Sequence, residues 1–442
     1  MRRWSTWPRA AAGAASSALA AAVFAFLDVL DVALCLVYAL VDGILEESPA
    51  RCYCHIRSPP DDDEEVSDTL YARRSAVRDA LLGLVRVATK TRTHRHRAPP
   101  EKPRWSDCGC KSCVAWRSGA GRLHVVAKEP DKPNKDAAGT ESDETATAEN
   151  NAAAIFVHGF TSSSSLWAET VFRESSVLSN TKLFAVDLLG FGQSPKPADC
   201  LYRLRDHVEA IETSLIEHNN LSSFHLVAHS MGCIIALALA AKHPHWVKSI
   251  TLVAPPYFLA CEQSASQVAL SRLAEKKLWP PLLFGSAVMS WYEHVGRTVC
   301  LLLCKNHRLW EWLYTLLTRK RDVDFRVRDL TKHTHHSGWH TMHNVICGGA
   351  RLQDRHLEAV QAAGIPVMLV HGVDDPVVPV ECSSRHLKAK LPRAELRLMP
   401  ACDHATVLLG RERGFAEDLA AFWSSSGSHR DYAARQRVNG GC

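Results

Sequence analysis

The sequence contains no long run of Lys or Arg that alternates with aromatic residues, and its formal net charge is only +5 over 442 residues. A nucleic-acid-binding protein needs a concentrated basic surface, so we exclude nucleic acid as a partner. The sequence also lacks a repeat of solenoid length and an HExxH zinc-protease motif. Because 46% of the residues are hydrophobic, we expect one large core with appended segments.

The N-terminal region lacks a second uninterrupted apolar span. Three arginines precede an uncharged stretch at 10–27, which is long enough for a signal anchor or a secretory signal. Apolar character resumes at 29–45, but aspartates interrupt it, and a charge at the bilayer centre costs about 2.5–3.5 kcal/mol. We therefore expect one span or cleaved signal within residues 1–47. The arginine bias predicts a chain that is secreted, or membrane-anchored with its catalytic domain outside the cytosol.

The fifteen cysteines fit either an oxidising compartment or ordinary buried thiols. Cys108, Cys110 and Cys113 form a C-x-C-x-x-C cluster, which is one ligand short of a zinc site. We favour a disulfide or free thiols there. Five histidines between His333 and His343 are also dense, but no carboxylate triad accompanies them. We expect them to have a structural or substrate-binding role, and we expect no metal and no cofactor.

Seven short apolar runs predict β-strands, and helical stretches separate several of them. A loop-rich collar at 48–120 precedes them, a polar disordered loop is expected at 128–150, and residues 426–442 form a flexible tail. Continuous apolar strands separated by helices predict an α/β fold whose mostly parallel sheet is covered on both faces. The expected strands are Leu123–Ala127, Ala153–Val157, Leu183–Asp187, Phe224–Ala228, Ser249–Ala254, Ile365–Val370 and Leu396–Pro400.

The strand that begins at Phe224 leads into Ala-His-Ser-Met-Gly, and a helix-like run follows at once. Small residues stand two positions before and two after Ser230, as a sharp strand–turn–helix requires. Such a nucleophile elbow raises a serine hydroxyl above the sheet. Ala228 stands where a glycine is usual, which keeps the requirement for a small residue. We predict that Ser230 is a catalytic nucleophile.

A serine hydroxyl needs a base, and the base needs a group to orient it. The loop His-Gly-Val-Asp-Asp-Pro-Val-Val-Pro follows a late strand. We choose Asp375, with Asp374 as the alternative, because loops of this type in related families place the acid four residues before the proline, here Pro379. His404 follows the last strand and is the expected base. The chain order Ser, Asp, His is the order that a fold with such a nucleophile elbow requires.

Two backbone N–H groups should stabilise the oxyanion that such a nucleophile forms. Met231 follows the serine directly, and Phe160 lies in the loop after the strand that ends at Val157, so we predict these two donors. Gly159 allows a close approach in that loop. We expect Gly159 and His229 to contact the substrate.

The motifs HGF, DLLGFGQS, AHSMG, HGVDDPVVP and CDH resemble the α/β-hydrolase superfamily over about residues 120–425. The blocks HGFTSSSSLW and HTHHSGWHTMHNVICGG, together with the N-terminal extension, resemble the plant BODYGUARD group of that superfamily. Members of that group are described as extracellular or membrane-associated hydrolases, named probable lysophospholipases, that take part in cuticle formation. The resemblance implies a serine esterase acting on a lipid ester.

Residues 256–345 interrupt the core pattern, which divides the hydrolase core into 121–255 and 346–425. The interruption is rich in Leu, Trp and Tyr, and a helical lid of this composition suits acyl chains because each buried CH₂ contributes about 0.8 kcal/mol. An acyltransferase using the same triad and a lipid or hormone sensor stay open. Leu409 stands where an H-x-x-x-x-D acyltransferase signature would carry its acid. The oligomeric state is not predicted.

Overall fold

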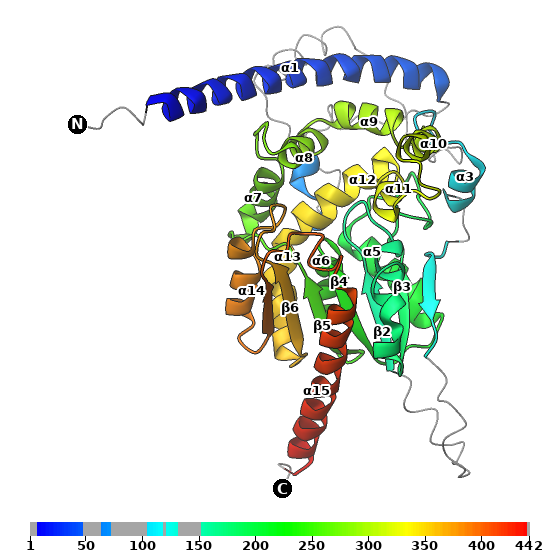
Figure 1. Cartoon of the computed structure of the whole chain (residues 1–442), viewed down its shortest axis with the longest axis vertical. Helices are drawn as coiled ribbons and strands as arrows, with labels where there is room; N and C mark the ends of the chain where they lie inside the picture. The colour runs from blue at the N-terminus through cyan, green and yellow to red at the C-terminus, as the bar shows by residue number, and fades with distance from the viewer. Residues whose placement is uncertain (1–6, 47–62, 72–103, 118–120, 131–151, 440–442) are drawn as a thin grey trace.

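The structure is a computed structural model that describes residues 7–46, 63–71, 104–117, 121–130 and 152–439 (Figure 1). Much of the collar expected at 48–120 and most of the loop expected at 128–150 lie outside the described residues.

A seven-stranded sheet forms the centre of the chain, in the order β1-β3-β2-β4-β5-β6-β7. Only β1 runs antiparallel to its neighbour, and every other neighbouring pair is parallel. Each of the seven expected strands overlaps one of these, so the predicted α/β fold is confirmed. The strands are β1 Val125–Lys128, β2 Ala152–Val157, β3 Thr181–Val186, β4 Phe224–His229, β5 Val247–Val253, β6 Val367–Gly372 and β7 Glu395–Met399.

Helices cover both faces of the sheet because the inner strands are apolar on both faces. In β2, Ile155 and Val157 pack into one hydrophobic cluster, whereas Ala154 and Phe156 pack into the opposite one. The first face carries α5 Leu204–Ile211, η5 Glu212–Glu217, α6 Gly232–Lys242, α13 Gly349–Ala362 and α14 Ser384–Lys390. The second face carries α4 Ser165–Ala168, η4 Val171–Leu178 and α15 Glu412–Asn439.

Helix α15 continues through 426–439, where the sequence predicts a flexible tail. The first part of this helix is anchored by Phe415, Leu419 and Trp423, which pack into the sheet core. The later part contains Ala, Arg and Gln, which have high helix propensity, so the helix can extend beyond its packed section.

Residues 256–345, which we call the cap, fold as helices between β5 and α13. The cap contacts the loops that follow the carboxyl ends of β2 and β3: the Ser163 hydroxyl donates to Asp329 Oδ2 at 2.5 Å, and the Ser337 hydroxyl donates to the Gly190 carbonyl at 2.9 Å. The cap therefore covers the edge of the sheet where ligands bind in this class of fold. Its helices are α7 Glu262–Leu273, α8 Pro281–Trp291, α9 Glu293–Leu302, α10 His307–Thr318, α11 Phe325–Leu330 and α12 His335–Thr341, which continues into η6 Met342–Gly348.

The N-terminal apolar segment is one continuous helix, α1 Trp7–Leu45, which lies along the cap (Figure 1). It passes through the aspartates that the sequence suggests as interruptions, because these side chains face the protein. Asp31 and Asp42 are buried, and Asp42 accepts two hydrogen bonds from the Arg297 guanidinium of α9, at 2.6 and 2.8 Å. The phenol of Tyr292 also donates to the Phe24 carbonyl.

The described parts of the collar also pack on the cap. Helix α3 Lys111–Arg117 and the residues before it lie beside α10, and the Lys305 ammonium donates to the Trp105 carbonyl at 2.7 Å. The short helix η2 Asp68–Leu70 packs on η6. A small helix, η7 Val380–Cys382, precedes α14.

Candidate active site

Ser230 stands at the sharp turn between β4 and α6, with a φ of 51° in the left-handed region. Its N–H donates to the Val253 carbonyl of the neighbouring strand at 2.8 Å, which holds the strained residue in place. A Cβ on Gly232 would lie 2.6 Å from the His158 carbonyl oxygen, so the second small residue of the elbow is sterically required. The turn leaves Ser230 half-buried.

The structure brings the two other predicted residues to this serine. His404 follows β7, and its Nε2 lies 3.0 Å from Ser230 Oγ. Asp375 follows β6, and its Oδ2 lies 2.7 Å from His404 Nδ1. Asp375 is buried, whereas the alternative Asp374 points to solvent. Three side chains distant in sequence therefore form one hydrogen-bonded chain at the carboxyl edge of the sheet.

Several donors surround the Asp375 carboxylate. Its Oδ1 accepts hydrogen bonds from the N–H groups of Val377 and Val378 at 2.8 and 2.9 Å. Burial alone would raise its pKa, but hydrogen bonds with His371 and His404 outweigh burial and hold the pKa well below its ordinary value. The carboxylate is thus ionised and can hold the imidazole of His404 in one orientation.

His158 fixes the loop after β2. The Leu188 N–H donates to its Nε2 at 2.9 Å, and its Nδ1–H donates to the Gly159 carbonyl at 2.7 Å. Burial lowers the pKa of His158, which favours the neutral ring that this pattern needs. The ring therefore sets the peptide between Gly159 and Phe160, one of the two predicted oxyanion donors.

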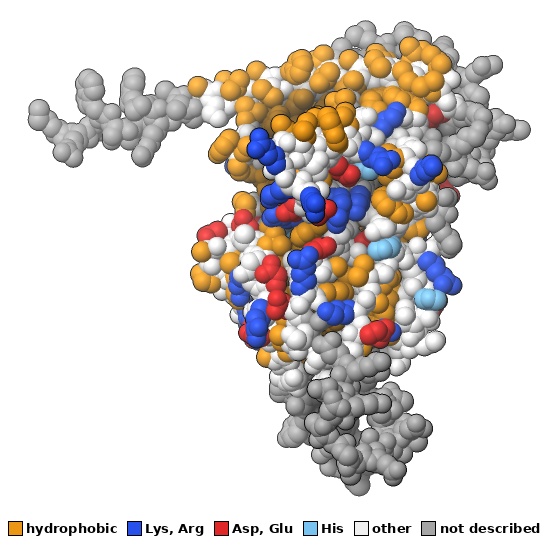
Figure 2. All heavy atoms as spheres, turned by 45° about the vertical axis from the view of Figure 1, so that its right-hand side comes forward, with side chains coloured by type: hydrophobic (Ala, Val, Ile, Leu, Met, Phe, Trp, Pro, Cys, Tyr) orange, Lys and Arg blue, Asp and Glu red, His pale blue; other side chains and the backbone are white. Residues whose placement is uncertain are grey.

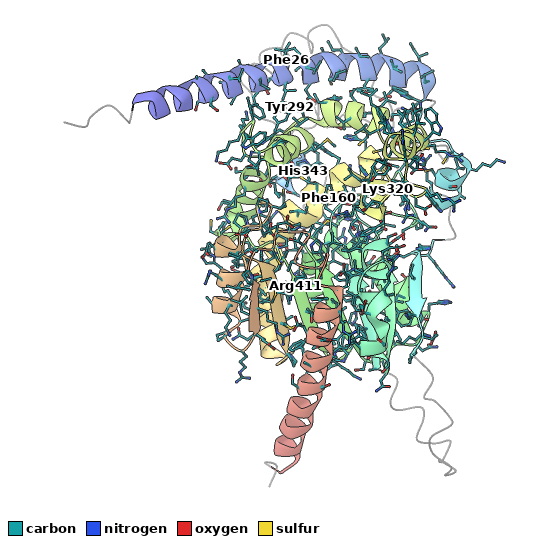
Figure 3. The ribbon with its side chains drawn as sticks, viewed as in Figure 1. Phe26, Phe160, Tyr292, Lys320, His343 and Arg411 are labelled. Atoms are coloured by element: carbon teal, nitrogen blue, oxygen red, sulfur yellow. The ribbon has the colours of Figure 1, made fainter. Side chains whose placement is uncertain are left out.

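The two predicted oxyanion donors are Phe160, in the loop after β2, and Met231, which follows Ser230 in the sequence. Met231 directly precedes α6 and is fully buried, and the ring of Phe160 packs edge-on against Phe191 with centroids 5.7 Å apart. Figure 3 shows Phe160 between the sheet and the cap helices. Within the described residues, neither of these two N–H groups donates to another backbone carbonyl, so both can serve a ligand.

Gly159 and His229, the expected substrate contacts, lie against the elbow. A Cβ on Gly159 would lie 3.1 Å from both His229 Nδ1 and Ser230 Cβ. His229 Nε2–H donates to the His404 carbonyl at 3.0 Å. Burial, reinforced by the neighbouring His404, lowers the pKa of His229 to about 3, so its ring is neutral near pH 7. The contact supports the backbone of His404.

Two histidines of the cluster at 333–343 join the cap to other parts of the fold. His336 Nε2–H donates to the Cys200 carbonyl at 2.9 Å, and His343 Nδ1 lies 2.9 Å from Thr69 Oγ1 of η2. Figure 3 shows His343 above the sheet, beneath the outer cap helices. These contacts agree with the structural role expected for the cluster.

Sequence reasoning did not assign roles to His158 and His371. Both end an apolar strand run and precede a glycine, and both are fully buried. The signal was present in the His-Gly pairs at 158–159 and 371–372, because a histidine at the carboxyl end of a strand faces the loops that form the site.

Comparison with known proteins finds a matching family and close relatives of this chain. The family model described as the α/β-hydrolase fold matches residues 154–410. Two relatives from Arabidopsis thaliana match nearly the whole chain. "Probable lysophospholipase BODYGUARD 4" is 47% identical over 95% of this chain and 100% of its own length. "Probable lysophospholipase BODYGUARD 1" is 38% identical over 91% of this chain and 95% of its own length.

Solved structures are similar only at the level of the fold. A carboxylesterase from Nitrososphaera gargenis is 16% identical, with a TM-score of 0.45 over 71% of this chain and 98% of its own. An enol-lactonase from Burkholderia xenovorans LB400 is 15% identical, with a TM-score of 0.44 over 68% of this chain and 96% of its own.

Proposed function

Because this chain belongs to the α/β-hydrolase family, and within it to the BODYGUARD group, we propose that it is a serine hydrolase that cleaves a carboxylic ester of a long-chain lipid. The observation that carries the proposal is the contact of 3.0 Å between His404 Nε2 and Ser230 Oγ, with Asp375 bound to the far side of the imidazole. A serine, an imidazole and a carboxylate in this order form a nucleophile, its base and a group that orients the base.

In the acylation step, Ser230 Oγ attacks the ester carbonyl while His404 Nε2 takes the hydroxyl proton. Asp375 stays ionised and stabilises the imidazolium that forms. The tetrahedral intermediate then collapses, the bond to the leaving alcohol breaks, and His404 returns the proton to that alcohol. An acyl group remains on the serine.

In the second step, water attacks the acyl group and His404 acts again as base and then as acid. The N–H groups of Phe160 and Met231 donate to the oxyanion in both steps, and one such donor contributes about 2.7–4 kcal/mol in the transition state. His158 is a positioning residue for this loop, because it binds the Gly159 carbonyl and not the substrate.

The proposed substrate follows from the relatives and the cap. The BODYGUARD relatives carry the name lysophospholipase, and a lysophospholipid or a cutin-monomer ester has the long acyl chain that an apolar lid would hold. We assign residues 256–345 as this lid and place Gly159 and His229 at the substrate's reacting end. A role in plant cuticle formation is part of the proposal.

We also propose that α1 associates with a membrane and that the catalytic domain lies outside the cytosol, or that the chain is secreted. By length and composition, residues 15–45 of this helix are apolar enough to cross a bilayer. However, the ion pair between Asp42 and Arg297 holds α1 against the cap, so the apolar side chains on its outer side would face lipid without crossing it (Figure 2).

The first test is labelling of the purified full-length protein with a fluorophosphonate, which reacts with activated serines. Wild type should be labelled and Ser230→Ala should not. The two adjacent acids offer a matched pair: Asp375→Asn should lower kcat on a lysophospholipid by about 10³- to 10⁴-fold, whereas Asp374→Asn should leave it near the wild-type value.

A folded wild type that fluorophosphonate does not label would contradict the enzyme and favour the sensor. If labelling persists in Ser230→Ala, the nucleophile is wrongly assigned. A panel of lipid esters with and without an alcohol acceptor then separates hydrolysis, which we expect, from acyl transfer to the alcohol.

A further inference from the structure

A group of metal-binding side chains lies outside the catalytic site, between α3 and the cap. The sulfurs of Cys108, Cys110 and Cys113 and the ring of His307 each offer one ligand atom, and these four atoms all lie within 4.8 Å of one another. His307 Nε2 is 3.6 Å from Cys110 Sγ and 3.5 Å from Cys113 Sγ. We propose that these four residues bind a structural Zn²⁺ ion.

The distances match a tetrahedral zinc site. With Zn–S near 2.3 Å and Zn–N near 2.0–2.1 Å, tetrahedral angles place a ligand sulfur and a ligand nitrogen about 3.6 Å apart. The two sulfur–nitrogen distances at His307 equal this separation within about 0.1 Å. Three cysteines and one histidine are also a common ligand set for structural zinc.

The histidine is held as a zinc ligand would be. Its Nε2 faces the sulfurs, and its Nδ1 lies 3.1 Å from the Glu311 carboxylate one turn further along α10. A carboxylate behind the second ring nitrogen fixes the orientation and tautomer of a metal-bound imidazole. In this arrangement Glu311 would orient the metal-binding ring of His307.

A disulfide explains the arrangement less well. Cys108, Cys110 and Cys113 are all free thiols in the structure. One disulfide would use two of them and leave the third cysteine and His307 without a shared partner. One metal ion uses all four ligand atoms. The sequence predicts a disulfide or free thiols here because the fourth ligand is 194 residues away from Cys113 along the chain.

The site would fasten the collar to the cap. Residues 104–117 hold the three cysteines, and the same segment binds α1, because Trp105 Nε1–H donates to Asp42 Oδ1 at 2.6 Å. His307 begins α10 of the cap. Zinc would therefore tie the collar to the cap, beside the place where the collar binds α1. With four protein ligands the coordination is closed, so the ion has no open position for catalysis.

A second group lies nearby and has to be separated in the experiment. Cys300 Sγ and Cys304 Sγ lie 3.7 and 3.8 Å from His333 Nε2. This group offers only three ligand atoms in the described residues. The test therefore measures the loss of one zinc equivalent when a ligand of the four-residue group is replaced. Any zinc bound by the second group stays in both wild type and variant and does not affect this difference.

The experiment measures the zinc content of the full-length protein, purified from cells grown with added Zn²⁺, by mass spectrometry of the metal. We expect at least one zinc per chain in wild type. Cys110→Ser and His307→Ala should each lose one equivalent. Cys261→Ser, at an exposed cysteine outside the group, should match wild type.

Three further readouts separate metal loss from misfolding. Circular dichroism and gel filtration check that each variant is folded. Hydrogen exchange of wild type should increase in residues 104–117 when a chelator removes zinc, and the catalytic core should change little. A folded wild type that holds no zinc overturns the proposal, whether its cysteines are free or paired as disulfides. So does a Cys110→Ser variant with the wild-type zinc content.

Discussion

His371 Nε2 lies 3.3 Å from Asp375 Oδ2, so the carboxylate that binds His404 is shared between two imidazoles. His371 Nε2 also lies 2.8 Å from the Val378 carbonyl, and its Nδ1 lies 2.6 Å from Ser384 Oγ. Since Nε2 faces two acceptors, it carries the ring proton, and Nδ1 accepts from the Ser384 hydroxyl. The second imidazole therefore fixes the carboxylate from behind.

Replacing His371 should impair catalysis without removing any group that contacts substrate. In His371→Phe, Asp375 loses one donor and can rotate, and a misplacement of about 1 Å at a catalytic group can cost on the order of a hundredfold in rate. We expect kcat to fall by about 10- to 100-fold with little change in KM. Steady-state kinetics on a lysophospholipid would measure the two constants separately.

Ser384→Ala is the matched control, because it removes only the hydrogen bond to the far nitrogen of His371. Its kcat should fall less than that of His371→Phe and in the same direction. A His371→Phe enzyme that is folded and has the wild-type kcat would show that the shared carboxylate does not need its second imidazole.

The two glycines at 232 and 285 should respond in opposite ways to alanine. A Cβ at Gly232 would lie 2.6 Å from the His158 carbonyl oxygen and 2.8 Å from the Val157 carbonyl oxygen, and backbone atoms cannot move aside cheaply. We expect Gly232→Ala to lower the free energy of unfolding by about 1–3 kcal/mol or more, and to lower activity by shifting the elbow.

Gly285 lies within α8, and a Cβ there meets no atom within 4 Å. Gly285→Ala should raise the free energy of unfolding by up to about 1 kcal/mol, because alanine favours helix. Urea unfolding of both variants would measure the two changes. If Gly232→Ala is as stable as wild type, the backbone at the end of β2 can move away from the elbow at little cost, and the prediction is wrong.

The sequence predicted those parts of the site that depend on local signals. Apolar strands and the small residues around Ser230 are visible in a short window, and the chain order of Ser230, Asp375 and His404 follows from the fold. The structure brings these three side chains together without changing any choice. The choice of Asp375 over Asp374 depended on the distance to Pro379, and burial separates the two acids in the same way.

Features that depend on distant contacts were not predictable. In the sequence, Asp42 interrupts an apolar segment. In the structure its carboxylate binds Arg297, which lies 255 residues later in the chain. His307 similarly joins Cys110 across 197 residues. Hydrophobic periodicity reports which face of a segment is buried, but it does not report which segment covers that face.

Acid should destabilise the fold below pH 6.5. Burial lowers the pKa of His207, His336 and His356 to about 4 from an ordinary value of 6.5. These rings are neutral in the folded chain between these values and would gain a proton on unfolding. Since the unfolded state then binds more protons, stability rises with pH, and it is lost as pH falls from 6.5 toward 4.

Differential scanning fluorimetry between pH 8 and pH 4 would measure this loss as a falling Tm. His356→Gln offers a control, because His356 lies on α13 and takes no part in the hydrogen bonds that join Ser230, His404 and Asp375. Proton uptake on unfolding at pH 5 should fall by about one in this variant. A Tm that stays constant down to pH 4.5 would contradict the burial of these rings.

The outer side of α1 should bind lipid. Phe26 and Leu40 are 64% and 66% exposed on this helix, whereas Asp42 faces the cap. Burying each apolar side chain in a bilayer contributes about 1.5–3 kcal/mol, so Phe26→Asp with Leu40→Asp should weaken binding to phosphatidylcholine vesicles by about 100-fold or more. Co-sedimentation of the full-length protein with vesicles would measure it.

The control adds the same charge elsewhere. Ala362→Asp with Ala363→Asp alters exposed residues at the end of α13, just before β6, whereas the cap and α1 cover the opposite edge of the sheet. This variant should sediment with vesicles as wild type does, because electrostatic repulsion by two distant carboxylates is screened beyond about 10 Å at 0.1 M salt. If both double variants bind like wild type, α1 is not the membrane contact; if both lose binding, net charge and not the apolar face controls association.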